Sequence, residues 1–380
     1  MLAALRRFPI ALALLALALP LHAQTQDEAM REMMKAMTPG PQHAEIARGA
    51  GRWSLERTIT MPGVQLFTST GESVGKMVLD GRFLEVETRG EMMGMSESSK
   101  VLVGYDNTRA LYTVVAMSTN STGMMMATGK KLEDGSYLYE GTIYEYPTPG
   151  GRPFRHTHRW VNDDTQVMEV FDRIDDAWVK VVTQTMRRKR ALFDGKSLAG
   201  WSRVALNDGD DMSKTWSVDH GILRCQGSPA GYIRTDGEYA DYELELEWRW
   251  APGSRGGNSG LLVHTSNPNQ LWGWPKCLEV QLQANNAGDF WEIGESAVVD
   301  DLEARRKGRN IKRVAREDVE RPIGEWNLMK VRCEGDRVRV WVNGELVNDG
   351  REVSAKKGAI CLQSEGAEIH FRRVELTPLR

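Results

Sequence analysis

The residues best suited to chemistry gather around one short extended run in the C-terminal half of the chain. Glu279 and Gln281 are two positions apart, so their side chains emerge on the same face of a strand. Acid–base chemistry by a carboxyl pair needs two such groups, whereas this run carries one carboxylate and the amides of Gln281 and Gln283. Because an amide can act neither as acid nor as nucleophile, the run favours chemistry with one base, unless Asp289 or Glu292 folds back as a partner.

Aromatic and polar side chains flank this run. Trp272, Trp274 and Trp291 crowd the same segment, and indole rings stack on sugars as readily as they fill protein cores. Asn258 and His264 precede the run and are further candidates to contact a substrate. Each has a structural alternative, since Asn258 can shape a turn and His264 can be a surface residue at the end of a strand.

Antiparallel strands are the elements expected to position these residues. Residues 242–250 alternate apolar and charged side chains over nine positions, which is typical of a strand with one face in a core. Residues 337–347 read as a strand, an Asn-Gly turn and a return strand. Residues 295–320 predict an excursion loop with at most a short helix. We therefore expect an antiparallel two-sheet sandwich in this half.

Several motifs resemble a known family. The run Leu-Phe-Asp-Gly-Lys-Ser-Leu-Ala-Gly-Trp at 192–201 is similar to the opening of the 3-keto-disaccharide hydrolase family, formerly DUF1080. Further motifs follow in the family's order at Tyr242–Trp250, Gly257–Leu261, Leu278–Leu282, Gly324–Asn327 and Gly358–Ile360. The resemblance covers residues 192–380 and implies a concanavalin-like jelly roll. It also implies a hydrolase that cleaves glycosides whose pyranose carries a ketone at C3.

A 3-keto sugar can be cleaved with a single base. The ketone acidifies the C2 proton, the glycosidic oxygen leaves from C1 by β-elimination, and water adds to the enone. With this resemblance, Glu279, His264 and Asp289 are the expected catalytic groups. Asn258, Gln281 and the three tryptophans are the expected substrate contacts. A divalent cation held by Glu279 and His264 is an alternative way to stabilise the enolate.

Two positions depart from the commoner family pattern. His264 stands where an arginine often follows the Asn-Ser-Gly strand, and Gln283 and Ala284 stand where an aspartate often follows the Glu-x-Gln strand. Asp289 is a nearby acid instead. The substrate and any metal site stay open, and a non-catalytic carbohydrate-binding module on the same sandwich is the alternative function.

The N-terminal half predicts a second all-β domain. From Trp53 onward, alternating runs and turn residues follow at short spacing, as in a barrel or sandwich. The Gly51-Arg52-Trp53 start and a late Arg188 resemble the closure of lipocalin-like (calycin) barrels, with the arginine over the indole. Residues 43–188 resemble DUF1579, a family of unknown function. We expect a barrel over 24–190 and the jelly roll over 191–380.

One histidine pair and the methionines are the residues that could give this barrel a binding site. His156 and His158 share a strand face, as two metal ligands would, but no third ligand is evident and a solvated pair is the favoured interpretation. Fifteen of the eighteen methionines lie between residues 24 and 190. Methionine fills apolar interiors, so a Met-lined cavity that binds a small apolar ligand is a second hypothesis for this half.

The start of the chain predicts an export signal over residues 1–23. Arg6 and Arg7 precede an apolar run that is shorter than the ~20 residues of a membrane span, and Ala23 offers a cleavage point. We therefore expect a secreted or periplasmic protein that begins at Gln24 and has no membrane span.

Charge and cysteine content exclude other classes. The 49 basic and 52 acidic residues give a net charge of −3, which offers little attraction to nucleic acid. Four cysteines in 380 residues do not make a disulfide scaffold. Cys333 and Cys361 lie in strand-like runs and either pair or remain buried thiols.

Overall fold

The computed structural model describes residues 26–60, 67–92, 94–145, 148–266, 273–314 and 319–379. The predicted export signal and Trp272 lie outside these residues. Within them, none of the helices combines the length and the apolar character that crossing a bilayer requires.

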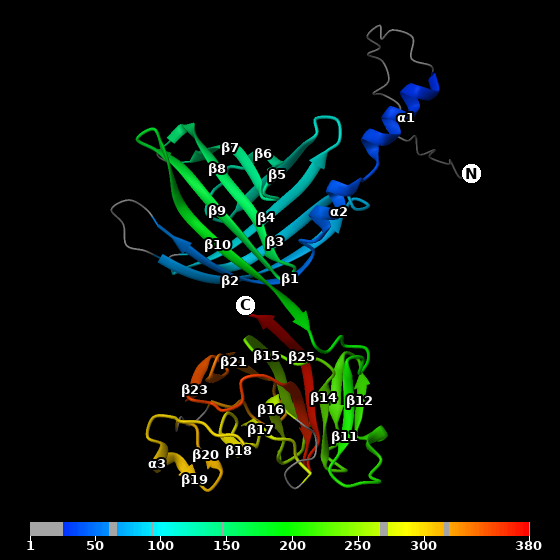
Figure 1. Ribbon diagram of the computed structural model, residues 1–380, viewed down its shortest axis with the longest axis vertical. Coiled ribbons are helices and arrows are strands. Elements are labelled where there is room, and N and C mark those ends of the chain that lie inside the picture. Colours follow the sequence, from blue (N-terminus) through cyan, green and yellow to red (C-terminus); the bar gives the residue numbers. More distant parts are fainter. Residues whose placement is uncertain are drawn as a thin grey trace, which may run out of the picture.

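The N-terminal half is a closed antiparallel barrel, which confirms the predicted fold. Each strand pairs with the next, and β10 pairs back onto β1 (Figure 1). The elements are α1 (Gln26–Met37), α2 (Pro41–Ala47), β1 (Gly51–Ile59), β2 (Phe67–Val78), β3 (Phe83–Met92), β4 (Met95–Asp106), β5 (Leu111–Ser118), β6 (Met125–Lys131), β7 (Tyr137–Glu145), β8 (Thr148–Asn162), β9 (Thr165–Ile174) and β10 (Ala177–Ala191).

The predicted closure of the barrel is present. The Arg188 guanidinium lies over the Trp53 indole, with Cζ 4.2 Å from the ring centroid. Its nitrogens donate to the carbonyl oxygens of Ala50 and Arg48 at 2.7 and 2.6 Å. Trp53 Nε1 donates to the Gly49 carbonyl at 3.0 Å. These contacts fasten the first and last strands to the segment that follows α2.

The C-terminal half is the predicted two-sheet sandwich. The back sheet has the order β12-β13-β25-β15-β21-β22-β23, and the front sheet has the order β11-β14-β24-β16-β17-β18-β20-β19. The elements are β11 (Trp201–Ala205), η2 (Met212–Lys214), β12 (Trp216–Asp219), β13 (Ile222–Cys225), β14 (Gly231–Thr235), β15 (Tyr242–Trp250), β16 (Gly260–Thr265), β17 (Cys277–Gln281), β18 (Phe290–Ile293), α3 (Leu302–Arg305), β19 (Arg306–Lys307), β20 (Asn310–Ile311), β21 (Asn327–Glu334), β22 (Arg337–Val342), β23 (Glu345–Gly350), β24 (Ala359–Ser364) and β25 (Ile369–Pro378).

Alternation along the strands builds the sandwich core. Leu244, Leu246 and Trp248 of β15 are fully buried in the same cluster as Leu278 and Val280 of β17. The Asn-Gly hairpin is also present: Asn343 and Gly344 turn between β22 and β23 with φ of 49° and 92°. The excursion expected over 295–320 holds the short α3 and two two-residue strands.

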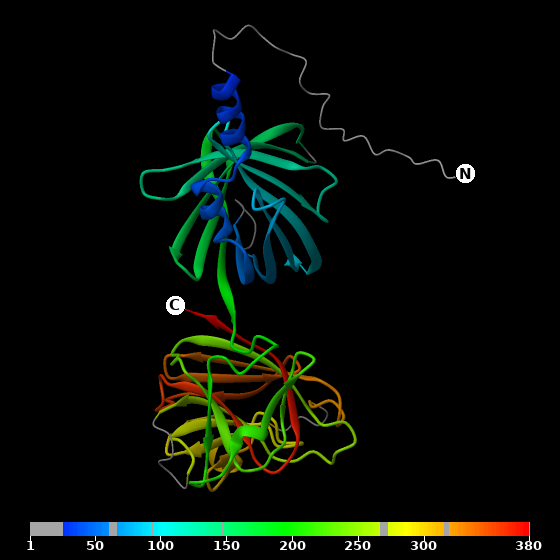
Figure 2. The ribbon, with the colours of Figure 1, turned by 90° about the vertical axis from the view of Figure 1, so that its right-hand side faces the viewer.

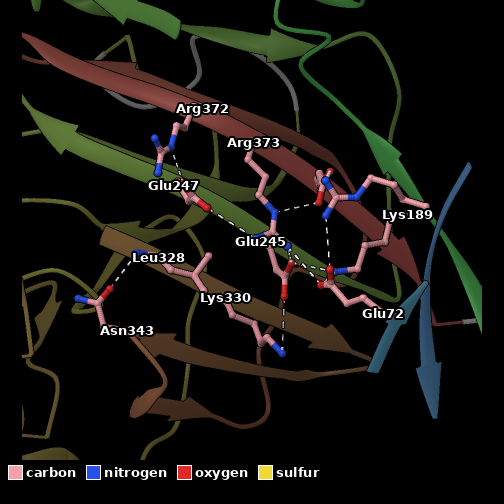
Figure 3. A network of polar contacts seen from close by, with 11 residues as sticks. Glu72, Lys189, Glu245, Glu247, Leu328, Lys330, Asn343, Arg372 and Arg373 are labelled. Atoms are coloured by element: carbon pink, nitrogen blue, oxygen red, sulfur yellow. Dashed lines mark hydrogen bonds and ion pairs between the residues drawn. The ribbon is translucent and has the colours of Figure 1, made fainter. Parts of the chain in front are cut away.

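Strand β10 joins the two halves directly. It runs out of the barrel, and its last residues, Arg190 and Ala191, pair with β25 of the back sheet (Figures 1 and 2). The Lys189 ammonium, whose side chain is 4% exposed, contacts Glu72 of the barrel and Glu245 of the sandwich. Arg373 reaches the same two carboxylates at 3.3 and 2.7 Å (Figure 3).

All four cysteines are buried free thiols. Cys333 lies in the sandwich core, whereas Cys361 belongs to a separate cluster on the other face of the front sheet. Cys333 and Cys361 therefore do not form a disulfide, because the front sheet separates them.

Candidate functional site

Glu279 lies at the centre of β17, on the outer face of the front sheet, the face that points away from the sandwich core. Its strand neighbours Leu278 and Val280 face the core. Across the ladder it is paired with Leu262 of β16 and Trp291 of β18. Only 3% of Glu279 is exposed. The strand thus buries a carboxylate among apolar neighbours.

An amide and a glycine shape the space around this carboxylate. Gln363 of β24 donates from Nε2 to Glu279 Oε2 at 3.3 Å, and Glu279 Oε1 has no hydrogen-bond partner among the described residues. A Cβ atom at Gly260 would lie 2.5 Å from Glu279 Oε1 and 2.7 Å from Gln363 Oε1. Gly260, the last residue of the Gly-Asn-Ser-Gly motif, therefore makes room for the carboxylate.

A second carboxylate, Glu365, accompanies Glu279. It follows β24, and its Oε2 accepts a 2.7 Å hydrogen bond from Asn258 Nδ2. Burial raises the pKa of Glu365. Burial, and then the charge of Glu365, raise the pKa of Glu279 well above its usual value, against the hydrogen bond from Gln363. No ion pair to either carboxylate is found within the described part of the chain. Because neither acid has a cation beside it, burial and the charge of Glu365 favour the protonated form of Glu279.

Gln281 presents a fixed amide on the same face. Its Oε1 accepts from the backbone N–H groups of Leu282 and Gln283 at 3.1 and 3.3 Å. This orientation leaves the Nε2 group as the free donor of the amide. Gln281 is thus suited to stabilise a developing negative charge on a bound molecule.

His264 does not join this site. A register irregularity follows Leu262 in the pairing of β16 with β24, and His264 itself has a φ of 52°. The ring packs edge-on against Tyr242, with centroids 5.5 Å apart, and its Nδ1 and Nε2 lie 2.9 and 3.0 Å from the carbonyl oxygens of Ala355 and Ala240. Burial lowers the pKa of His264. The expectation that His264 and Glu279 project into one concave face is therefore wrong, because the irregularity turns the imidazole toward the other side.

The acids that the sequence offered as partners make contacts of their own, away from the Glu279 carboxylate in the case of Glu292 and with the backbone of Arg313 in the case of Asp289. Asp289 lies across the ladder from Gln281, and its Oδ1 accepts the backbone N–H of Arg313 at 2.7 Å. Burial raises its pKa. Glu292 is bound by Arg306 at 3.0 Å and by the backbone N–H of Ala297 at 3.0 Å. Glu365, which is not among the residues expected from the sequence, supplies the second carboxyl group.

A metal site from the expected ligands does not assemble, because the two nitrogens of His264 already face backbone carbonyls. The described residues contain no group of three or more His, Cys, Asp or Glu side chains placed to hold a metal ion. Of the expected sugar contacts, Trp291 is half-buried opposite Glu279, and Trp274 is half-buried and stacked on Tyr232 at 6.2 Å.

Profiles of two families match the chain. The family described as 3-keto-alpha-glucoside-1,2-lyase-like domain matches residues 188–377, and DUF1579, a protein family of unknown function, matches residues 38–188. Both resemblances seen in the sequence are thereby confirmed. No curated protein matches the chain.

Solved structures resemble one half or the other. A protein from Parabacteroides distasonis named as a glycosyl hydrolase is 22% identical over 50% of this chain and 94% of its own, with a TM-score of 0.37. Carbohydrate binding module CBM66 from Bacillus subtilis is 15% identical over 47% and 95%, with a TM-score of 0.35. Rv2717c from M. tuberculosis is 15% identical over 40% and 100%, with a TM-score of 0.31.

Proposed function

Because the chain belongs to the family of 3-keto-alpha-glucoside-1,2-lyase-like domains, we propose that it is a carbohydrate-active enzyme that cleaves glycosides whose pyranose carries a ketone at C3. The observation that carries the proposal is the pair of carboxyl groups formed by the buried Glu279 and the half-buried Glu365 on the outer face of the front sheet. Perturbed acids that lack a cation are expensive to bury, and such groups concentrate at functional sites.

The two carboxyl groups take opposite roles in the proposed reaction. The pKa of Glu279 is raised further than that of Glu365, so Glu279 carries the proton and Glu365 is the base. Glu365 takes the C2 proton, and the C–H electron pair moves toward the C3 ketone to form an enolate, for which Gln281 is a donor. As the C1–oxygen bond breaks, Glu279 protonates the leaving oxygen. Water then adds to the enone and gives the free 3-keto sugar.

The tryptophans supply the binding surface in this proposal. Trp291 lies directly across the ladder from Glu279, and Trp274 is the second indole of the same face. A pyranose stacked on them would place its C1 and C2 near the carboxyl pair. Trp272 remains a predicted contact that lies outside the described residues.

The ketone requirement is the test of the proposal. The chain from Gln24 onward is incubated with 3-keto-trehalose and with trehalose in deuterated water. We expect release of 3-keto-glucose only from the oxidised substrate, with deuterium at C2 of the product, because the C2 proton of an unoxidised sugar is too weakly acidic to be removed. Brisk turnover of trehalose, or a product that keeps its C2 hydrogen, would instead assign the two carboxyl groups to ordinary hydrolysis.

The alternative is a non-catalytic carbohydrate-binding module, and the same experiment separates it from an enzyme. Saturable sugar binding, measured by calorimetry, without release from either substrate would favour the binding module. Repeating the reaction with and without EDTA tests for a divalent cation, which the arrangement of Glu279 and His264 does not favour.

Export completes the proposal. A cleaved signal over residues 1–23 would place the enzyme outside the cytoplasm, in the periplasm or the medium. N-terminal sequencing of the protein recovered from those fractions should begin at Gln24. A protein found only in the cytoplasm with Met1 retained would contradict this part.

A further inference from the structure

The barrel holds a cavity of about 410 Å³ that opens to solvent. Helix α2 contributes Glu45 and Ile46 to its wall, and the remaining lining comes mainly from apolar and aromatic side chains of the strands, among them four methionines. This volume lies within the range of about 300–1,000 Å³ that is typical of small-molecule sites. The interior of this barrel therefore has the size and the surface of a ligand site rather than of a packed core.

The charged groups of the lining are already paired. Glu45 accepts from the Lys131 ammonium at 2.8 Å and from the hydroxyls of Tyr112 and Tyr137 at 2.9 Å each. Arg57 donates to Glu97 at 2.6 Å, and it is the one cation among the described lining residues. An anionic ligand would thus have to displace Glu97 or lose its hydration without compensation. The cavity favours an uncharged molecule.

One polar pair inside the cavity is left without partners. Phe154, His156, His158 and Trp160 alternate along β8 and all line the cavity, so the histidines are not the solvated pair that the sequence favoured. His158 Nε2 is 2.7 Å from Gln166 Oε1. His156 and the Tyr139 ring stack at 4.4 Å and are 6% and 4% exposed. Within the described residues, neither the His156 nitrogens nor the Tyr139 hydroxyl makes a hydrogen bond.

His156 is held neutral in this position. Burial, and then the neighbouring His158, lower the pKa of His156 to about 4. A neutral imidazole carries one donor and one acceptor. Buried polar groups are nearly always hydrogen-bonded, and an unmet one costs free energy that a ligand's hydroxyl or carbonyl group would recover.

We propose that the barrel cavity binds an uncharged, largely apolar small molecule that carries one hydroxyl or carbonyl group, and that this group hydrogen-bonds to His156 and Tyr139. The ligand's apolar body fills the space between the barrel strands. This site is separate from the carboxyl pair of the sandwich, and the inference does not depend on the proposed reaction.

The first test compares two ligands that differ only in charge. The full chain is titrated at pH 7.5 with N-phenyl-1-naphthylamine, an uncharged fluorescent probe, and the bound probe is displaced with decan-1-ol or with decanoate. We expect saturable binding of the probe and displacement by the alcohol at a concentration at least about tenfold lower than by the carboxylate. No saturable binding, or equal or better displacement by decanoate, would overturn the proposal.

Three variants test whether the probe and the alcohol bind inside the barrel cavity. Ala116→Trp fills the cavity and should abolish probe binding. His156→Phe keeps the ring but removes its nitrogens, and should weaken decan-1-ol about three- to tenfold while the probe's own affinity changes less. Thr157→Val, on the neighbouring position that does not line the cavity, is the matched control and should change neither. Circular dichroism checks that each variant is folded. If Ala116→Trp does not fold, an unchanged alcohol affinity in folded His156→Phe still rejects the assigned contact.

Discussion

Glu45 of the barrel and Glu279 of the sandwich lie in opposite electrostatic surroundings. In the barrel, Glu45 is surrounded by an ammonium and two phenol hydroxyls, and although burial alone would raise its pKa, these hydrogen bonds lower it. In the sandwich, Glu279 receives one weak amide hydrogen bond, has a second carboxyl group nearby, and its pKa is raised. A carboxylate with partners stabilises a fold, whereas one without them costs stability and is retained where its protonation is used.

The largest expected effect separates the two carboxylates by function. Glu279→Gln should lower kcat/KM for 3-keto-trehalose by roughly 10²–10⁴-fold, because the leaving oxygen loses its acid. Glu45→Gln, the matched change in the barrel, should leave the rate unchanged. Steady-state kinetics of both variants provide the measurement. A Glu279→Gln enzyme with full activity would remove this residue from the site.

The same variant also tells the two roles apart. Glu279→Gln should still exchange the C2 hydrogen of the substrate with deuterated water, and it should lose less activity on p-nitrophenyl 3-keto-glucoside, whose leaving group needs no acid. Glu365→Gln should abolish exchange on both substrates. If exchange is instead lost in Glu279→Gln and kept in Glu365→Gln, Glu279 is the base and Glu365 is the acid.

The second effect concerns the joint between the halves. Lys189 is buried between Glu72 of the barrel and Glu245 of the sandwich (Figure 3). Lys189→Met should destabilise the protein by about 2–4 kcal/mol, because Glu72 and Glu245 lose a buried cation and keep only Arg373 in common. Lys180→Met is the control on the same strand: Lys180 pairs with Glu169 but is half exposed, so its loss should cost under about 1 kcal/mol. Urea unfolding of both variants tests the difference, and equal losses would contradict it.

A third effect tests the room left for Glu279. Gly260→Ala places a Cβ against the carboxylate and the Gln363 amide, and should cost about 1–3 kcal/mol of stability together with activity. Gly150→Ala in the barrel is the control, because no atom lies within 4 Å of a Cβ built there. If both variants melt at the temperature of the parent and Gly260→Ala keeps full activity, the proposed crowding is absent.

Much of the fold could be predicted because it follows from local pattern. Alternation over 242–250 and the Asn-Gly turn specify strands and a hairpin without any tertiary information, and both are present. The Trp53–Arg188 contact was predictable for a different reason, since closing a barrel must bring its first and last strands together.

The candidate site was harder to predict because it depends on pairing between distant strands. His264 was misplaced, since a single residue with positive φ reverses the face of the positions that follow. Gln363 and Glu365 alternate on one strand face in the sequence, which is the signal that was available. Only the position of β24 next to β16 brings them toward β17, and no spacing in the chain reveals that.

The smallest expected effect is on stability: relative to the parent, Glu279→Gln and Glu45→Gln should change their free energy of unfolding with pH in opposite directions. The pKa of Glu279 is raised above its usual 4.5, so the native state binds the extra proton, and stability is lost as pH rises from 4.5 through the folded pKa. Glu279→Gln should therefore gain stability over the parent as pH rises, by about 1.4 kcal/mol for each pH unit between 4.5 and the pKa of the folded state.

The pKa of Glu45 is lowered, so its contribution to stability is present above 4.5 and is lost as pH falls. Glu45→Gln should accordingly lose stability relative to the parent at neutral pH and approach it in acid. Urea unfolding at pH 4, 5.5 and 7.5 measures both differences, and the same sign of pH dependence in the two variants would show that the barrel and the sandwich do not treat these carboxylates differently.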